Sequence, residues 1–262
     1  MSPRKILSIV MQEIYLSRRS LEVIIDLGFF SIISTIVFGF VAVWLAGTGN
    51  KQSALYILVG LNFWNIVSIS SYSIAVGTLW NIWSRSLTSV FVAPVSMKEY
   101  MAAHVLSALL KTAVIVVITS MIIVFVFKFN IFSLGLINWM LIFFNLFLFA
   151  CSVGFTTLGL ILRYGTRIQA LAWSVSSLFQ PLTAALYPIN VLPPPLQTVA
   201  YALPPTYVFE ATRVYINSSI IRFDLYLTSF VLNIVYLTLS LSFFWFLFNK
   251  SKETGQFAKN EE

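Results

Sequence analysis

Few side chains in this sequence are of the types that do chemistry. His104 is the only histidine and Cys151 the only cysteine among 262 residues. A metal site or a nucleophilic catalytic site needs several acids, histidines or thiols close together, and neither residue has such neighbours in the sequence. We therefore interpret His104 as a hydrogen-bonded structural residue and Cys151 as a small buried hydrophobe. We expect no catalytic residue and no metal ligand in this chain.

Residues that would bind a nucleotide or couple transport to an ion are also missing from the sequence. It contains no Gly-x-x-x-x-Gly-Lys-Ser/Thr loop, the motif whose backbone amides cradle nucleotide phosphates. Lys111 is the one charged residue well inside an expected membrane span, whereas ion-coupled carriers place ionisable groups there. We expect Lys111 to face protein or to snorkel. Any energy source should then lie outside this chain, and we expect the chain itself to hold no cofactor.

The composition is typical of a protein that is embedded in a lipid bilayer. Hydrophobic residues make up 59% of the chain, charged residues make up 10%, and the mean hydropathy is +0.90. A soluble fold of this composition would leave much apolar surface in water. The formal net charge is +7, but the basic residues stand at the ends of apolar runs and not in a stripe interleaved with aromatics, so nucleic acid is not an expected partner.

The order of apolar and polar runs predicts a single all-α membrane domain over residues 1–262. A spanning helix needs roughly 20 apolar residues, and six runs qualify: 27–46, 54–78, 101–127, 135–162, 168–186 and 225–248. Residues 3–20 are amphipathic and predict a helix that lies on the membrane surface. Residues 79–100 are too polar to span, and the proline-rich run 187–221 predicts short re-entrant helices.

The distribution of lysine and arginine predicts the orientation. With both termini in the cytoplasm, Arg4, Lys5, Arg18, Arg19, Arg85, Lys98, Arg163, Arg167, Lys250, Lys252 and Lys259 lie inside. Lys51, Lys128, Arg213 and Arg222 are then the basic residues outside. Cytoplasmic loops carry the excess of basic residues in membrane proteins. We therefore expect a multi-pass protein of the cell inner or plasma membrane with residues 79–100 in the cytoplasm.

Uncharged polar residues occur in stripes on the first, second and fifth expected spans. The candidates for lining a substrate pathway are Ser34, Asn62, Asn65, Gln180 and Thr183. The alternative is that such residues join helices through hydrogen bonds inside the bilayer. The sequence alone leaves both interpretations open.

Two segments carry a resemblance to a known family. In 192–213, prolines precede Pro204, Thr206 and Tyr207, and then Glu210 and Arg213, which are three residues apart and could pair on one helical face. In 86–96, an amphipathic stretch ends in Pro94-Val95-Ser96. Both segments resemble those of the type-2 ABC exporter permeases. In that family the first segment lies at an extracytoplasmic gate, and the second is a cytoplasmic coupling helix that docks on an ATPase.

The resemblance implies a function for the chain. It implies that the chain forms a homodimer, or a dimer with a close paralogue, in the lipid membrane. Separate ATPase subunits, which bind ATP and Mg²⁺, would drive this dimer. Residues expected to couple to the ATPase are Trp83, Arg85, Leu87, Val90, Phe91 and Pro94. The exported substrate would be a drug, a lipid or a lipid-linked glycan. The alternatives are a non-ABC carrier, a structural subunit of a membrane complex, or a lipid-modifying enzyme, which the missing acid and histidine clusters disfavour.

Overall fold

The computed structural model describes residues 2–84, 92 and 94–254, and all its regular elements are helices. Among these residues the α-helices are α1 (Pro3–Arg19), α2 (Leu21–Ile24), α3 (Phe30–Gly47), α4 (Lys51–Trp83), α6 (Met97–Phe125), α7 (Leu136–Tyr164), α8 (Leu171–Leu182), α9 (Pro194–Ala202), α10 (Pro204–Ser218) and α11 (Phe223–Glu253). Short π or 3-10 turns are η1 (Ile25–Phe29), η2 (Ile131–Leu134), η3 (Gly165–Ile168) and η4 (Ile189–Val191). The predicted all-α class is confirmed.

Five helical stretches of the described chain are long and apolar enough to cross a membrane: Leu21–Gly47, Lys51–Trp83, Met97–Phe125, Leu136–Ile168 and Phe223–Glu253. They contain the expected spans 27–46, 54–78 and 225–248, and they overlap 101–127 and 135–162. The second expected span was too short, because residues 79–83 continue α4 and do not belong to the connecting segment. The third begins at Met97, because Ser96 and Glu99 form a capping box that starts α6 four residues before the predicted bound.

The expected fifth span differs most from the structure. In place of one helix over 168–186, α8 covers the 12 residues Leu171–Leu182. A helix of that length rises about 18 Å, which is short of the roughly 30 Å hydrocarbon core of a bilayer. Pro181 lies in the last turn of α8, and Ala184 follows in the left-handed region with a φ of 51°. Both features end the helix.

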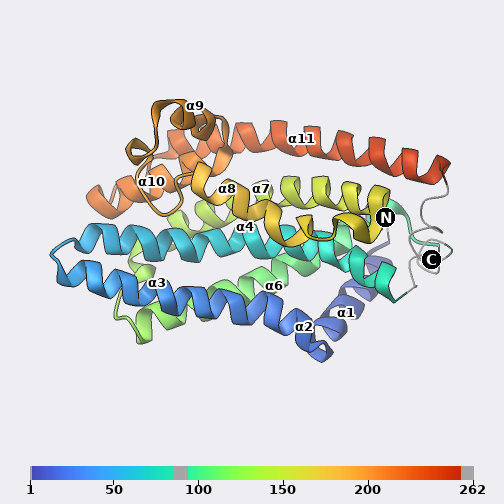
Figure 1. Ribbon diagram of the computed structural model, residues 1–262, viewed down its shortest axis with the longest axis horizontal. Helices are drawn as coiled ribbons and strands as arrows, with labels where there is room; N and C mark the ends of the chain where they lie inside the picture. Colours follow the sequence, from blue (N-terminus) through green and yellow to red (C-terminus); the bar gives the residue numbers. More distant parts are fainter. Residues whose placement is uncertain (1, 85–91, 93, 255–262) are drawn as a thin grey trace.

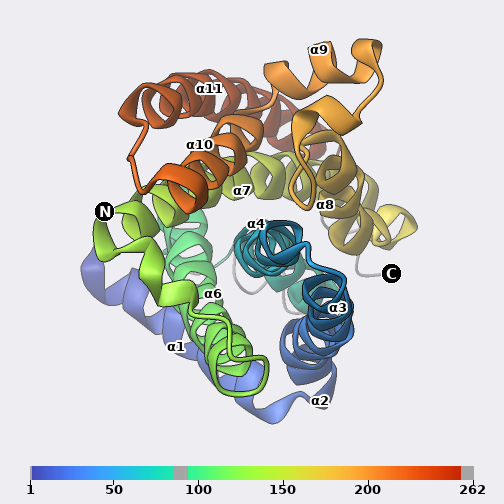
Figure 2. The ribbon, with the colours of Figure 1, turned by 90° about the vertical axis from the view of Figure 1, so that its left-hand side faces the viewer.

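The long helices run side by side, and α4 lies in the middle of them (Figure 1, Figure 2). Figure 2 looks along the bundle and shows α4 surrounded by α3, α6, α7, α8 and α10. Two glycines of α4 explain how neighbours approach it so closely. A Cβ on Gly60 would overlap the backbone carbonyl of Ala185, and a Cβ on Gly77 would overlap the His104 ring. Small residues at such points are how membrane helices pack without a hydrophobic driving force.

Helix α1 and the last helix share one end of the bundle. Figure 1 shows that α1 begins and α11 ends where α4 ends and α6 begins. The loops α3–α4, α6–α7 and α10–α11 lie at the opposite end. The predicted arrangement of the termini on one side agrees with this layout, and the chain is a multi-pass helical bundle.

Candidate functional site

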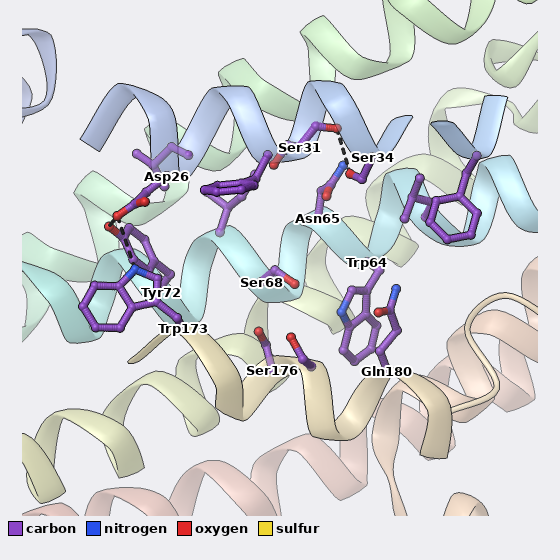
Figure 3. A pocket seen from close by; sticks show the side chains of 16 residues that line it. Asp26, Ser31, Ser34, Trp64, Asn65, Ser68, Tyr72, Trp173, Ser176 and Gln180 are labelled. Carbon is purple, nitrogen blue, oxygen red and sulfur yellow. Dashed lines mark hydrogen bonds between the residues drawn. The ribbon is translucent and has the colours of Figure 1, made fainter. Parts of the chain in front are cut away.

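A cavity of about 560 Å³ lies between α3, α4 and α8 (Figure 3). Ser34, Asn65 and Gln180, three of the residues proposed from the sequence as pathway lining, face it. A cavity of 300–1,000 Å³ is the usual size for a small-molecule site in a protein. The structure therefore brings these three residues together from two consecutive helices, α3 and α4, and from α8, which lies about 90 residues further along the chain.

Asn62 and Thr183 are not among the residues that line this cavity. Both are fully buried. Asn62 donates to the Ser120 hydroxyl at 2.9 Å and accepts from the Thr119 hydroxyl at 2.6 Å, which joins α4 to α6. The Thr183 hydroxyl donates to the Gln180 carbonyl at 3.2 Å. Asn62 thus makes contacts of the kind that the helix-joining interpretation describes, whereas the bond of Thr183 is local to the end of α8.

The Asp26 carboxylate lines one end of the cavity and is not one of the residues expected from the sequence to line a pathway. Oδ2 of Asp26 accepts from the Tyr72 hydroxyl at 2.5 Å and from the Trp173 indole N–H at 3.2 Å. Asp26 lies in η1, a π-helical turn that continues directly into α3. Because the expected first span begins at residue 27, Asp26 falls just outside it. The unbroken helical pattern before residue 27 was the signal that could have found it.

Two of the residues expected to couple to an ATPase, Trp83 and Pro94, are among the described residues, and Trp83 lies at the Asp26 end of the cavity beside Trp173. Trp83 is 39% exposed, contacts Trp80 edge-on at 5.2 Å and stacks on Trp173 at 6.4 Å between ring centroids. The Pro94 carbonyl accepts from the Lys5 ammonium of α1. Arg85, Leu87, Val90 and Phe91 lie outside the described residues, and their role stays a prediction.

An ion pair ties α1 to α6. The Glu13 carboxylate and the Lys111 ammonium are 2.9 Å apart, with side-chain exposures of 8% and 12%. The expectation that Lys111 faces protein is confirmed. Burial by itself raises the pKa of a carboxyl, but the neighbouring His104 and Lys111 hold the pKa of Glu13 below its ordinary range. The pair therefore contributes stability at neutral pH, and this contribution is lost as pH falls through the lowered pKa.

His104 lies beside this pair, but not in the way the sequence suggested. Its ring is fully buried, and neither ring nitrogen has a hydrogen-bond partner among the described residues. Nδ1 is 3.9 Å from the Glu13 carboxylate, and the ring meets that of Tyr100 edge-on at 4.3 Å. The close approach of Gly77 explains the missing partner, because α4 backbone occupies the space in front of the ring. His104 is a packing residue.

At the opposite end of the bundle, Arg213 holds a strained turn in place. The predicted pairing with Glu210 is confirmed, since the guanidinium donates to that carboxylate at 2.6 Å. A second guanidinium nitrogen donates to the Ala184 carbonyl. The Glu210 carboxylate also accepts from the Ile189 amide at 3.1 Å. A non-glycine residue in the left-handed region costs about 1–3 kcal/mol, so the turn at Ala184 needs such support.

The other residues assigned to the gate from the sequence join α9, α10 and α11. The Thr206 hydroxyl donates to the Ala200 carbonyl at 2.6 Å, and the Tyr207 hydroxyl donates to the Tyr201 carbonyl at 2.9 Å. The carbonyl of Pro204, the first residue of α10, accepts from the Ser229 hydroxyl of α11 at 2.9 Å. These contacts hold α9 against α10 and α10 against α11.

The contact between α4 and this turn gives a testable prediction. We expect Gly60→Ala to lower the stability of the purified protein by about 1–3 kcal/mol, because the new methyl group overlaps the Ala185 carbonyl and forces the backbone apart. The measurement is thermal unfolding in detergent. Gly47→Ala is the matched control, because a Cβ there meets nothing within 4 Å. Equal melting temperatures for the two variants would contradict the packing described.

Sequence comparison assigns the chain to a family. The family model for ABC-2 type transporters matches residues 4–217, well over half of the 262 residues. No curated protein matches the chain in a sequence comparison. Together with the five long apolar helices, the match shows a transmembrane permease of an ABC-type transporter. The chain therefore belongs to the ABC-2 type transporter family.

Proposed function

We propose that the chain is the permease subunit of an ATP-driven exporter that works as a homodimer with separate ATPase subunits. The observation that carries the proposal is the cavity between α3, α4 and α8, which lies within the part of the chain that matches the family. The missing nucleotide-binding loop supports a separate ATPase. The substrate is hydrophobic or amphiphilic and moves outward.

We assign both termini to the cytoplasm, with the Trp83 end of the bundle facing inward. The charge distribution supports this orientation, because the basic residues gather in the segments at that end. Residues 165–189 return from the end where α7 stops to the end where α9 begins (Figure 1). We assign this path, with α8 at its centre, as a sixth and broken crossing. Its irregular backbone packs against α4, as non-helical backbone at membrane depth must.

The ATPase is proposed to act on the segment between α4 and α6. A rigid connection is needed for ATP-driven movement to reach the cavity. Trp83 supplies part of it, because its ring stacks on Trp173, which itself donates to Asp26 at the end of the cavity. Helix α1 supplies another part, through Lys5 to the Pro94 carbonyl and through Glu13 to Lys111. A push on the connecting segment would then move α1, α6 and α8 together.

Phe91→Asp tests the proposal. We expect ATP hydrolysis coupled to the permease to fall tenfold or more in this variant, on the order of a 1.4 kcal/mol loss in docking, because a charge would replace an apolar side chain that is proposed to dock on the ATPase. The measurement is co-purification of the ATPase and its activity in liposomes. The matched control is Phe132→Asp, an exposed phenylalanine in η2 at the opposite end. Loss of activity in both variants, or in neither, would favour a non-ABC carrier or a structural subunit.

A further inference from the structure

We propose that the Asp26 end of the cavity binds an organic cation, so that the substrate is an amphiphile with an amine or quaternary ammonium group. This inference rests on the proposed function, since it gives a chemical class to the cargo of that pathway. Figure 3 shows the arrangement: Asp26, Tyr72 and Trp173 converge at one end, and the rest of the lining combines serine and amide side chains with apolar ones.

The charge of the cavity is negative at this end. Asp26 is the one charged residue among the described residues that line the cavity. Its two hydrogen bonds come from a phenol and an indole, which are neutral donors and leave the carboxylate charge uncompensated. Glu22 lies one helical turn earlier and is exposed. Lys111 of α6, whose side chain is 12% exposed, is already paired with Glu13. A carboxylate in such surroundings attracts a counter-cation.

Aromatic rings frame the carboxylate. The rings of Tyr72 and Trp173, which both donate to Asp26, are 6.1 Å apart at their centroids, and Trp83 stacks on Trp173 with 6.4 Å between centroids. Trp80 extends the cluster, with its ring 5.2 Å from that of Trp83. The negative faces of tryptophan and tyrosine rings attract ammonium groups, with about 0.5–2 kcal/mol for each contact. A carboxylate beside two such rings is suited to a cation with organic substituents.

The remainder of the cavity suits the body of an amphiphile. Apolar walls come from side chains such as Phe30, Phe38 and Trp64. Asn65 also faces the cavity, is 6% exposed, and its amide nitrogen has no hydrogen-bond partner among the described residues. A buried donor without a partner is costly, so an acceptor on the substrate would stabilise it. The cavity thus offers a cation site, apolar walls and one unused donor.

The same features disfavour anionic cargo. A lipid-linked glycan carries phosphate groups, and Asp26 would repel them at close range with no lining arginine or lysine among the described residues to compensate. Between the substrate classes that an exporter of amphiphiles accepts, the geometry therefore favours cationic compounds.

Binding of two probes of nearly equal size and opposite charge tests the proposal. Tetraphenylphosphonium and tetraphenylborate are each equilibrated with the purified full chain in detergent and dialysed against empty micelles, so that partition into the micelles cancels. We expect tetraphenylphosphonium to bind and tetraphenylborate to bind at least about tenfold more weakly, because one carboxylate acts in a partly desolvated site.

Asp26→Asn identifies the site. The asparagine oxygen can still accept from Tyr72 and Trp173, so the variant should fold, and a gel-filtration profile checks this. We expect it to bind tetraphenylphosphonium about tenfold more weakly, because only the charge is removed. Asp224→Asn is the matched control, an exposed carboxylate at the opposite end of the bundle that pairs with Arg222, and it should bind as the wild type does.

Two results would overturn the proposal. One is equal binding of both probes by the wild type, and the other is unchanged tetraphenylphosphonium affinity in Asp26→Asn. Neither result would contradict the proposal that the chain is a permease subunit, because that proposal is tested by ATPase coupling in the Phe91→Asp experiment. Conversely, a chain that binds cations at Asp26 but never couples to an ATPase would keep this site and lose the exporter function.

Discussion

Lys111→Met is expected to lower the free energy of unfolding by about 3–5 kcal/mol, because it leaves the buried Glu13 carboxylate without its ion-pair partner. The carboxyl group must then stay charged in a poorly solvated place or take up a proton. Protonating a carboxyl with the ordinary pKa of 4.5 at pH 7 costs about 3 kcal/mol, which sets the same scale. Thermal unfolding of the purified chain in detergent, followed by tryptophan fluorescence, measures the loss.

The controls for Lys111→Met use the difference between the two residues of the ion pair, because the Glu13 side chain is less exposed than that of Lys111. Glu13→Gln should cost less, because the lysine has a long flexible side chain and 12% of it is already exposed. The double variant Glu13→Leu with Lys111→Met should regain most of the stability, since neither charge remains buried. The deficit of Lys111→Met should also shrink as pH falls from 7 toward 4.5, where Glu13 is protonated in the unfolded chain. A deficit that does not change with pH would contradict the assignment to Glu13.

Arg213→Lys is expected to lower stability by about 2–4 kcal/mol even though it keeps the charge. The guanidinium reaches the Glu210 carboxylate with one nitrogen and the Ala184 carbonyl with another, and an ammonium group cannot hold both. The buried carbonyl would lose its partner at a position with a φ of 51°. Thermal unfolding and limited proteolysis, with cleavage expected between α8 and α9, measure the effect.

Arg222→Lys is the matched control for Arg213→Lys. Arg222 also pairs with a carboxylate, that of Asp224 at 2.6 Å, but both side chains are about half exposed. Solvent screens such a pair, so this substitution should cause no measurable change. Similar losses in both variants would mean that arginine is needed for its charge alone, and the described support of the Ala184 turn would be wrong.

Much of the fold follows from local sequence. Long apolar runs with polar ends predicted helices α4, α6, α7 and α11, and the charge-free run before Gly47 predicted α3. The motif from Pro204 to Arg213 predicted an ion pair three residues apart on one helix, and the pair is formed. These features depend on neighbours within a few turns of chain, and hydrophobic periodicity records them directly.

Helix ends and the break after α8 were harder to predict. The sequence placed one helix over 168–186, although Pro181 stands in it, because the run is apolar throughout. Prolines are tolerated in membrane helices when neighbours satisfy the freed backbone groups, so the residue alone does not decide. The left-handed turn at Ala184 depends on Arg213, which lies 29 residues away. Its position could not be read from local propensity.

The sequence by itself determined that this protein lies in a lipid bilayer, that it is helical and to which family it belongs. These properties depend on composition, on runs of apolar residues and on short motifs. Only the tertiary structure decided which polar side chains meet. It paired Glu13 with Lys111 across 98 positions, brought Trp173 to Asp26 across 147, and separated Ser34, Asn65 and Gln180 in the cavity from Asn62 in the core. The reason is geometric, because a helix carries polar residues on several faces, and the rotation of each helix about its axis is set by packing against all its neighbours at once.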